Sequence, residues 1–175
     1  MTSKFNVRIA SLDDAPRLAV LAAQVWTHTY ATDGISQDIA EFVLCELNSD
    51  RYRHAIDDSS TLVLVAECGV YLVGFAVVKF GSACTVEGVS DTELKTLYVQ
   101  ELFTGQGVGR LLLQAAQTQS RERASGAMWL SVNATNHRAM SFYTRLGYRK
   151  IGTSYFVLGV AQHENHVLVG ASVVV

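Results

Sequence analysis

A β-strand pattern runs into a glycine-rich turn and then into a helical pattern in the second half of this 175-residue chain. The strand is Glu93–Val99, the turn is Thr104-Gly-Gln-Gly-Val-Gly-Arg110, and apolar residues recur at helical spacing after it. Three glycines in five residues are costly unless the backbone must take positive φ or let a ligand approach closely. Several free N–H groups at a helix start can hold an anion. The segment therefore predicts a phosphate site.

Two common phosphate loops do not fit this turn. A Walker A loop requires a Gly-Lys pair, which the chain lacks. A dinucleotide fingerprint requires a third glycine three places after the second, where Arg110 stands. The turn therefore belongs to another class of phosphate site.

The length of the chain suits one domain, and we expect residues 1–175 to form it. Apolar residues make up 49% of the chain and charged residues 17%, which is typical of a compact fold. The formal net charge of −2 gives no general attraction to nucleic acid or to an anionic membrane, and we expect neither as a partner.

Neither a membrane span nor a signal peptide is expected, because the apolar runs are short and Met1 to Arg8 contains none. The three cysteines, Cys45, Cys68 and Cys84, show no C-x-x-C spacing, which argues against a disulfide frame or a metal site. We expect each of them to be buried, and the protein to be cytoplasmic.

The remaining patterns predict a mixed α/β chain. Strands are expected at Val7–Ala10, Thr61–Glu67, Leu72–Phe80, Glu93–Val99, Ala127–Val132, Tyr148–Leu158 and Val167–Val173. Helices are expected through Leu18 to Trp26, at Ser36–Leu47, briefly within Asn48 to Ser60, from Val108 to Ser125-Gly126 and at Asn136–Leu146. In the second helix we expect Ile39, Phe42 and Val43 to face the core. The order of elements implies one mixed sheet with helices on it.

A second pattern lies downstream of the turn. Trp129-Leu-Ser-Val-Asn133 leads into Asn136-His-Arg-Ala139, Phe142-Tyr143 and Leu146-Gly-Tyr148. Together the two patterns resemble the motifs of the GNAT N-acetyltransferase superfamily, which are Q/R-x-x-G-x-G/A after a strand and then N-x-x-A, F-Y and L-G-F/Y after the next strand. Thr104 departs from the first motif, where the family usually has Gln or Arg.

This resemblance implies the GNAT fold, an α+β fold whose central, mostly antiparallel sheet is splayed and flanked by helices. It also implies acetyl-CoA as the cofactor, with the pyrophosphate on the turn and the pantetheine arm in the slot between Glu93–Val99 and Ala127–Val132. Asn136 either bonds the arm or caps its own helix, for which Asn is a preferred residue. The implied cofactor-binding residues are Leu97, Tyr98, Val99, Thr104, Gly105, Gln106, Gly107, Val108, Gly109, Arg110, Asn133, Asn136, Ala139 and Phe142.

The same resemblance implies direct transfer of an acetyl group to an amine. Tyr143 is the expected general acid, which protonates the leaving thiolate, although its helical stripe also suits a core position. Only a neutral amine is nucleophilic, so a general base or water is useful. Glu93 is the expected base, and His163 or His166 is the alternative.

We expect the acceptor pocket between the first two helices and the last hairpin, with Trp26 and Tyr30 as substrate-binding residues. His28, Asp33 and Asp38 could add a polar rim suited to a cationic amine, which belongs to a small molecule or a peptide. The alternatives are an acyltransferase using another acyl-CoA and a non-catalytic acyl-CoA sensor. The valine-rich end, Gly170 to Val175, pairs either within the sheet or across a homodimer interface.

Overall fold

The computed structural model describes residues 4–123 and 126–170. Its strands are β1 (Asn6–Ile9), β2 (Thr61–Cys68), β3 (Tyr71–Lys79), β4 (Glu93–Val99), β5 (Trp129–Asn133), β6 (Arg149–Leu158) and β7 (Ala161–Val169). Its α-helices are α1 (Ala15–Tyr30), α2 (Gln37–Glu46), α3 (Ser49–Asp57), α4 (Val108–Arg123) and α5 (His137–Arg145), with short 3-10 helices at η1 (Leu12–Asp14) and η2 (Glu101–Phe103). None of the helices in the described part of the chain has the length and apolar character that a membrane crossing needs.

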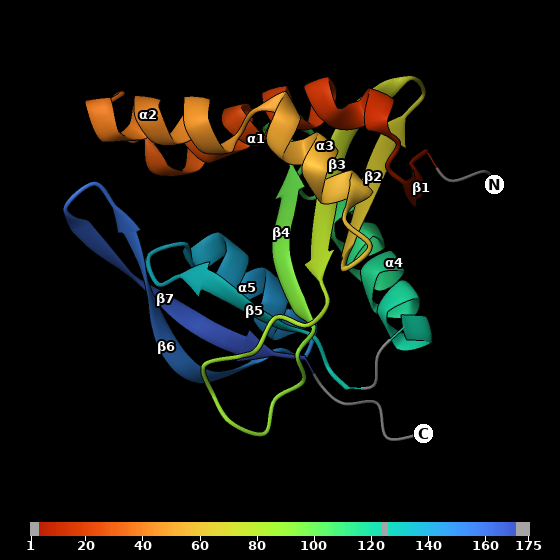
Figure 1. Ribbon diagram of the computed structural model, residues 1–175, viewed down its shortest axis with the longest axis vertical. Helices are drawn as coiled ribbons and strands as arrows, with labels where there is room; N and C mark the ends of the chain where they lie inside the picture. The colour runs from red at the N-terminus through yellow and green to blue at the C-terminus, as the bar shows by residue number, and fades with distance from the viewer. Residues whose placement is uncertain (1–3, 124–125, 171–175) are drawn as a thin grey trace.

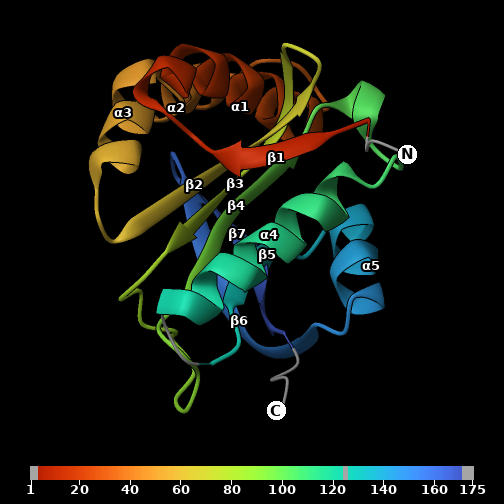
Figure 2. The ribbon, with the colours of Figure 1, turned by 90° about the vertical axis from the view of Figure 1, so that its right-hand side faces the viewer.

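All seven strands form one sheet in the order β1-β2-β3-β4-β5-β7-β6. Every neighbouring pair is antiparallel except β4 and β5. In Figure 2, α4 crosses one face of the sheet while α1, α2 and α3 lie along the opposite side. The expected α+β fold with a mostly antiparallel sheet is confirmed.

The central strands are apolar on both faces because helices cover both. In β2, Leu62 and Leu64 pack with residues of α4, whereas Val63 and Val65 pack with residues of α1 and α3. Such a strand has a continuous apolar run rather than an alternating pattern. The two clusters hold the sheet between two helical layers.

The sheet is split between β4 and β5. These parallel strands pair only at Glu93 and Trp129, at the beginning of each strand. Beyond that pair they diverge, and Figure 1 shows β4 rising toward α1 while β5 turns toward β7 and β6. The expected slot therefore opens beside the carboxyl ends of both strands.

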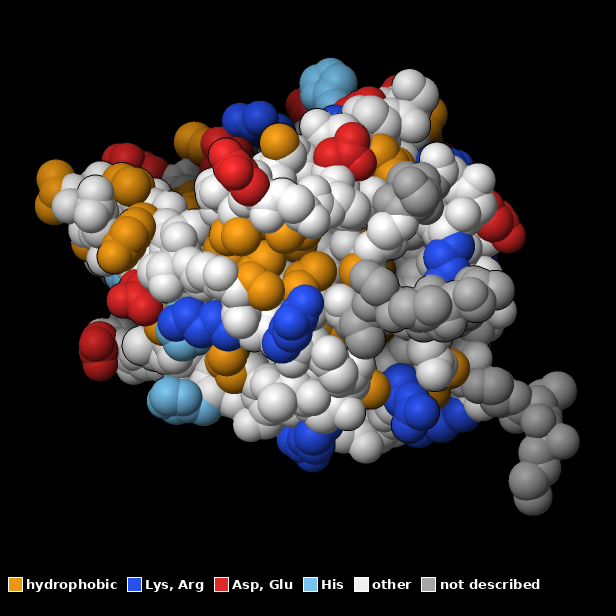
Figure 3. All heavy atoms as spheres, turned by 90° about the horizontal axis from the view of Figure 1, so that it is seen from below, with side chains coloured by type: hydrophobic (Ala, Val, Ile, Leu, Met, Phe, Trp, Pro, Cys, Tyr) orange, Lys and Arg blue, Asp and Glu red, His pale blue; other side chains and the backbone are white. Residues whose placement is uncertain are grey.

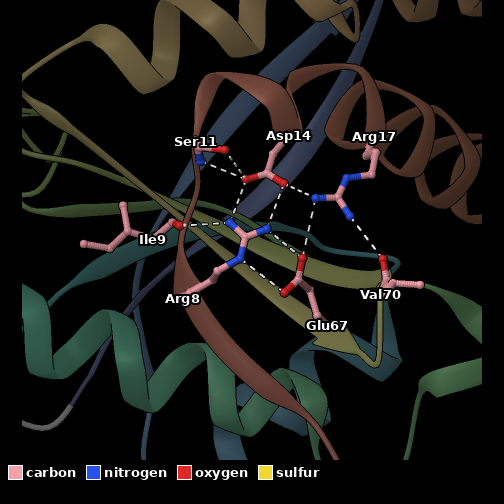
Figure 4. A network of polar contacts seen from close by, with 7 residues as sticks. All are labelled: Arg8, Ile9, Ser11, Asp14, Arg17, Glu67 and Val70. Carbon is pink, nitrogen blue, oxygen red and sulfur yellow. Dashed lines mark hydrogen bonds and ion pairs between the residues drawn. The ribbon is translucent and has the colours of Figure 1, made fainter.

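A network of charged side chains ties the beginning of the chain to the sheet (Figure 4). Asp14, which is fully buried, accepts hydrogen bonds from Arg8 at 2.7 and 3.0 Å, from Arg17, and from the backbone N–H of Ser11 at 2.8 Å. Arg8 also donates to Glu67 at 2.6 Å. The network joins β1, the start of α1 and β2.

The structure differs from the expectations for α2 and for the cysteines. No residue of α2 is buried, so Ile39, Phe42 and Val43 do not reach the core; Ile39 and Phe42 line a cavity instead. Cys45, on the same helix, is exposed, and Cys68 and Cys84 are only partly buried. The expectation of three buried cysteines is therefore wrong.

The last strand begins earlier than expected, at Ala161 rather than Val167. Its first residues are polar and lack an apolar pattern, but their backbone pairs with β6 from Leu158 and Ala161 onward around a turn at Gly159. Residues 171–175, on which the dimer expectation depended, lie outside the described part.

Candidate functional site

The glycine turn has the backbone that its sequence predicts. Gly105 and Gly107 have φ values of 73° and 90°, and a Cβ built on either would meet no atom within 4 Å. The first intrahelical bond after the turn runs from the N–H of Leu111 to the carbonyl of Gly107. The earlier amides of α4 have no partner within the helix, and the space in front of both glycines is open.

Three side chains of the turn are engaged elsewhere. The Thr104 hydroxyl donates to the carbonyl of Glu101 at 2.7 Å. Gln106 accepts from Lys4 at 3.0 Å and donates to the carbonyl of Leu102 at 2.8 Å. Val108 is buried in the core. Of the expected cofactor-binding residues, Gln106 and Val108 can therefore contribute only their backbone groups to the binding of an anion at the turn.

A cavity of about 590 Å³, here called the donor cavity, joins the turn to α5. It brings together most of the residues expected to bind the cofactor, together with Tyr143 and Tyr30. Its lining includes Leu97, Tyr98, Val99, Thr104, Gly105, Gly107, Gly109, Arg110, Asn136, Ala139 and Phe142. Gly109 lies beside Phe142, and a Cβ there would be in ordinary van der Waals contact with the ring, at 3.4 Å.

Tyr143 lies on α5 and faces the donor cavity with 7% of its surface exposed. Burial raises the pKa of its phenol well above the usual value, and the nearby phenols of Tyr148 and Tyr30 add to the shift. Its hydroxyl has no hydrogen-bond partner among the described residues. At neutral pH it is a protonated donor facing the cavity.

The two asparagines of the second motif have local roles in this structure. Asn136 caps α5 by accepting from the N–H of Ala139 at 3.0 Å. Asn133 accepts from the N–H and hydroxyl of Thr135 at 2.9 and 2.6 Å and lines a different cavity from the turn. The amide N–H groups of Asn133 stay available for other contacts, whereas the side chain of Asn136 also bonds the phenol of Tyr30.

A second cavity, of about 1260 Å³ and here called the acceptor cavity, lies between the first three helices and strands β4 to β7. Glu93 lines it and accepts a hydrogen bond from Ser82 at 2.7 Å. Trp26, Tyr30, Asp38 and His163 also line it, whereas His28 lines the donor cavity. Asp33 and His166 line neither of the two.

A row of three aromatic rings lines the acceptor cavity. Trp26 of α1 packs against Phe42 of α2 with ring centroids 4.7 Å apart, and Phe42 meets Phe156 of β6 edge-on at 5.6 Å. Trp26 is 5% exposed, so it is both a core residue and part of the cavity wall. The rings connect the N-terminal helices to the last hairpin.

The two cavities share three lining residues, Thr29, Tyr30 and Tyr98. Burial raises the pKa of both phenols, and for Tyr30 a hydrogen bond with Asn136 partly opposes the rise. A group passing from one cavity to the other must therefore pass neutral tyrosines.

The donor cavity contains a salt bridge that the motifs did not predict. Glu101 of η2 pairs with Arg138 of α5, whose Nη1 lies 2.9 and 2.8 Å from the two carboxylate oxygens. Glu101 lies outside both motifs, and Arg138 occupies one of the variable positions of N-x-x-A. Their partnership spans 37 residues, which is why local sequence gave no signal for it.

The face of the molecule shown in Figure 3 carries charged side chains of both signs. Acidic and basic side chains lie among one another on the face shown in Figure 3, with a small hydrophobic patch near its centre. Within residues 4–123 and 126–170, no three His, Cys, Asp or Glu side chains are grouped so that they could hold a metal ion.

Comparison with known proteins agrees with this architecture. The family model of the GNAT acetyltransferase domain matches residues 27–164. An uncharacterised N-acetyltransferase of Mycobacterium tuberculosis is 30% identical over 154 residues, which are 88% of this chain and 94% of the relative. Streptothricin acetyltransferase of Streptomyces lavendulae is 34% identical over 112 residues, or 63% of this chain and 56% of that enzyme.

The fold is also similar to that of a solved structure, the PaiA N-acetyltransferase of Thermoplasma acidophilum in complex with coenzyme A. The TM-score is 0.78 at 22% identity, over 95% of this chain and 98% of the other. At that identity the likeness concerns the fold alone. The family model and the mycobacterial relative go further, and from them it follows that this chain belongs to the GNAT family of acetyltransferases.

Proposed function

We propose that residues 1–175 act as one catalytic domain that transfers an acetyl group from acetyl-CoA directly to a primary amine. The observation that carries this proposal is the shared wall of the two cavities. One holds the open glycine turn and Tyr143, and the other holds Glu93. A donor and an acceptor bound on either side would meet at Tyr30 and Tyr98.

The residues of the donor cavity suit coenzyme A. The unpaired amides of the turn and the guanidinium of Arg110 would hold the pyrophosphate, with help from the positive end of the α4 dipole. Main-chain groups near Leu97 and Val99, beside the split in the sheet, would bond the amides of the pantetheine arm. When bound, acetyl-CoA supplies an activated thioester, whose C–S bond breaks as the C–N bond to the amine forms.

Two proton transfers accompany this exchange. Tyr143 donates its proton to the departing sulfur, since its raised pKa keeps the phenol protonated until the thiolate forms. Glu93, or water in the acceptor cavity, receives the proton that the amine loses. His163 lines the same cavity and is the second candidate for the base.

The acceptor is proposed to be the amine of a small molecule or of a peptide. The aromatic wall of Trp26, Tyr30 and Phe42, with the carboxylate of Asp38, suits a cation on an apolar body. The similarity to an enzyme named for streptothricin supports a small-molecule amine.

Replacing Tyr143 by Phe tests the chemistry. Tyr143→Phe should lower kcat about a hundredfold because a general acid is lost, while calorimetry finds coenzyme A affinity unchanged within about twofold. The matched control is Tyr148→Phe, which also removes a buried phenol; that ring lies 5.5 Å from Tyr143 and lines neither cavity.

The readout is release of free coenzyme A across a panel of amines. Equal turnover of the two variants would reduce Tyr143 to a packing residue. Tight binding of acetyl-CoA without turnover of any amine would favour the acyl-CoA sensor.

A further inference from the structure

The charged groups of the donor cavity are unequally engaged. Two guanidinium groups, those of Arg110 and Arg138, line it together with one carboxylate, that of Glu101. Arg110 forms no ion pair or hydrogen bond with another described side chain. Arg138 donates from one nitrogen, Nη1, to both carboxylate oxygens of Glu101. Among the described residues, the cavity thus contains one guanidinium without an acidic partner and one that is paired with a carboxylate, both in the cavity of the glycine turn.

The pair between Glu101 and Arg138 crosses the opening of the split sheet. Glu101 directly follows β4 and Gln100, whereas Arg138 lies in the first turn of α5, which follows β5. On its other side, Glu101 lies 3.7 Å from Nε2 of His28 in α1. One carboxylate therefore contacts groups from both halves of the molecule at the cavity.

The turn itself offers no cationic side chain before Arg110. Thr104 bonds the carbonyl of Glu101, and the polar atoms of Gln106 are engaged away from the cavity. A doubly charged anion bound at the turn would share the cavity with both Glu101 and Arg138. The carboxylate of Glu101 would repel this anion, and the guanidinium of Arg138 would attract it. A planar guanidinium can bind two phosphate oxygens as well as it binds a carboxylate.

We infer that Glu101 holds Arg138 across the donor cavity in the unliganded protein, and that Arg138 exchanges Glu101 for the pyrophosphate of coenzyme A. The inference rests on the proposed function, because it takes coenzyme A as the ligand. Glu101 acts as a competitor for Arg138, so its charge lowers cofactor affinity. Arg138 is a second phosphate-binding residue on the α5 side.

Calorimetric titration with coenzyme A and with 3′-dephospho-coenzyme A tests the exchange without relying on activity. Arg138→Gln should weaken both ligands about tenfold, because both carry the pyrophosphate. Glu101→Gln should tighten both about two- to fivefold, the range expected for release of an exposed ion pair. In the double variant the effect of Glu101→Gln should vanish, because its benefit depends on Arg138.

The control is Arg145→Gln, which removes the same charge from the same helix; among the described residues, Arg145 bonds only the carbonyl of Ser141. It should change affinity by less than about twofold at moderate salt. Unaltered affinity in Arg138→Gln, or weaker binding in Glu101→Gln, would overturn the inference. A loss confined to coenzyme A would assign Arg138 to the 3′-phosphate and also refute it. If the wild-type protein binds neither ligand, the proposed function itself fails.

Discussion

Asp14 shows how one residue can hold several elements together. Its side chain is fully buried, yet it is charged, because two arginines and a backbone N–H surround it. The hydrogen bond from Arg8 is the largest cause of a pKa well below the usual range for a carboxyl group, and burial opposes it. A buried charge is tolerable only while such partners remain.

Removing the charge of Asp14 should therefore be costly. Asp14→Asn leaves Arg8 without its carboxylate partner on this side, and we expect a loss of about 2–4 kcal/mol in the free energy of unfolding. The estimate lies below that for a fully buried pair because Arg8 and Arg17 are partly exposed. Urea unfolding followed by circular dichroism measures it, with Asp13→Asn as the exposed neighbouring control.

The same carboxylate predicts how stability depends on pH. An aspartate in the unfolded chain has a pKa of about 3.9, above that of folded Asp14, so the unfolded state binds the proton first as pH falls. The stabilisation by the Asp14 carboxylate is fully present above the unfolded-state pKa of about 3.9, and it is lost progressively as the pH falls from there toward the folded-state pKa. Between pH 5 and pH 3, the wild-type protein should lose stability more steeply than Asp14→Asn. Parallel curves for the two proteins would refute this assignment.

At the scale of elements, the turn between β6 and β7 lies against α2. Gly159 has a φ of 57°, and a Cβ built there would clash with the carboxylate of Asp38. Asp38 lines the acceptor cavity, and so do Leu158 and Ala161 on either side of the turn. A movement of the turn against α2 would therefore change the shape of the cavity there.

Gly159→Ala should therefore disturb the acceptor cavity. Asp38 or the turn must shift, and we expect KM for the amine to rise at least about threefold while coenzyme A affinity is unchanged. Gly69→Ala is the matched control, because Gly69 has a φ of 61° in another hairpin turn with no atom within 4 Å. Both variants should lose about 1 kcal/mol of stability from the left-handed backbone. A KM effect of equal size in Gly69→Ala would argue against a local cause.

On the scale of the whole molecule, the sheet has two halves that share one hydrophobic core. Strands β1 to β4 form one half and β5, β7 and β6 the other, and among the described strands the halves pair only at Glu93 and Trp129. Below the split, Leu130 and Leu168 pack in the same core cluster as residues of β2 and α4. The ring contacts of Trp26, Phe42 and Phe156 add a further link beside the acceptor cavity. The proposed reaction takes place beside the split, where the two cavities meet.

Loss of the ring of Phe156 should weaken the connection between the halves. Phe156→Ala should reduce the free energy of unfolding by about 1–2 kcal/mol, less than for a fully buried ring because Phe156 is 36% exposed. It should also raise KM for the amine. Tyr155→Ala removes the adjacent ring, which is 63% exposed and lines neither cavity, and should change stability by less than about 0.5 kcal/mol. Equal effects on KM would contradict a bridging role.

Local patterns were sufficient for much of this architecture. The strand Glu93–Val99 has the expected bounds, and the glycine turn and the cap at Asn136 lie where their residues predicted. Each depends on a few neighbouring residues, whose φ requirements and capping groups act over one turn of chain. The polar start of β7 was missed because backbone pairing with β6, rather than its side chains, makes it a strand.

The family, and with it the acetyl donor, could be inferred from two short motifs, because the turn and the residues around Tyr143 are contiguous in sequence. The place where donor and acceptor would meet could not be inferred from the sequence, because Tyr30, Tyr98 and Asn136 come from three separate parts of the chain. The same holds for the pairs of Glu101 with Arg138 and of Asp38 with Gly159. Such contacts exist only after the sheet has formed and split, because packing rather than local preference brings their residues together.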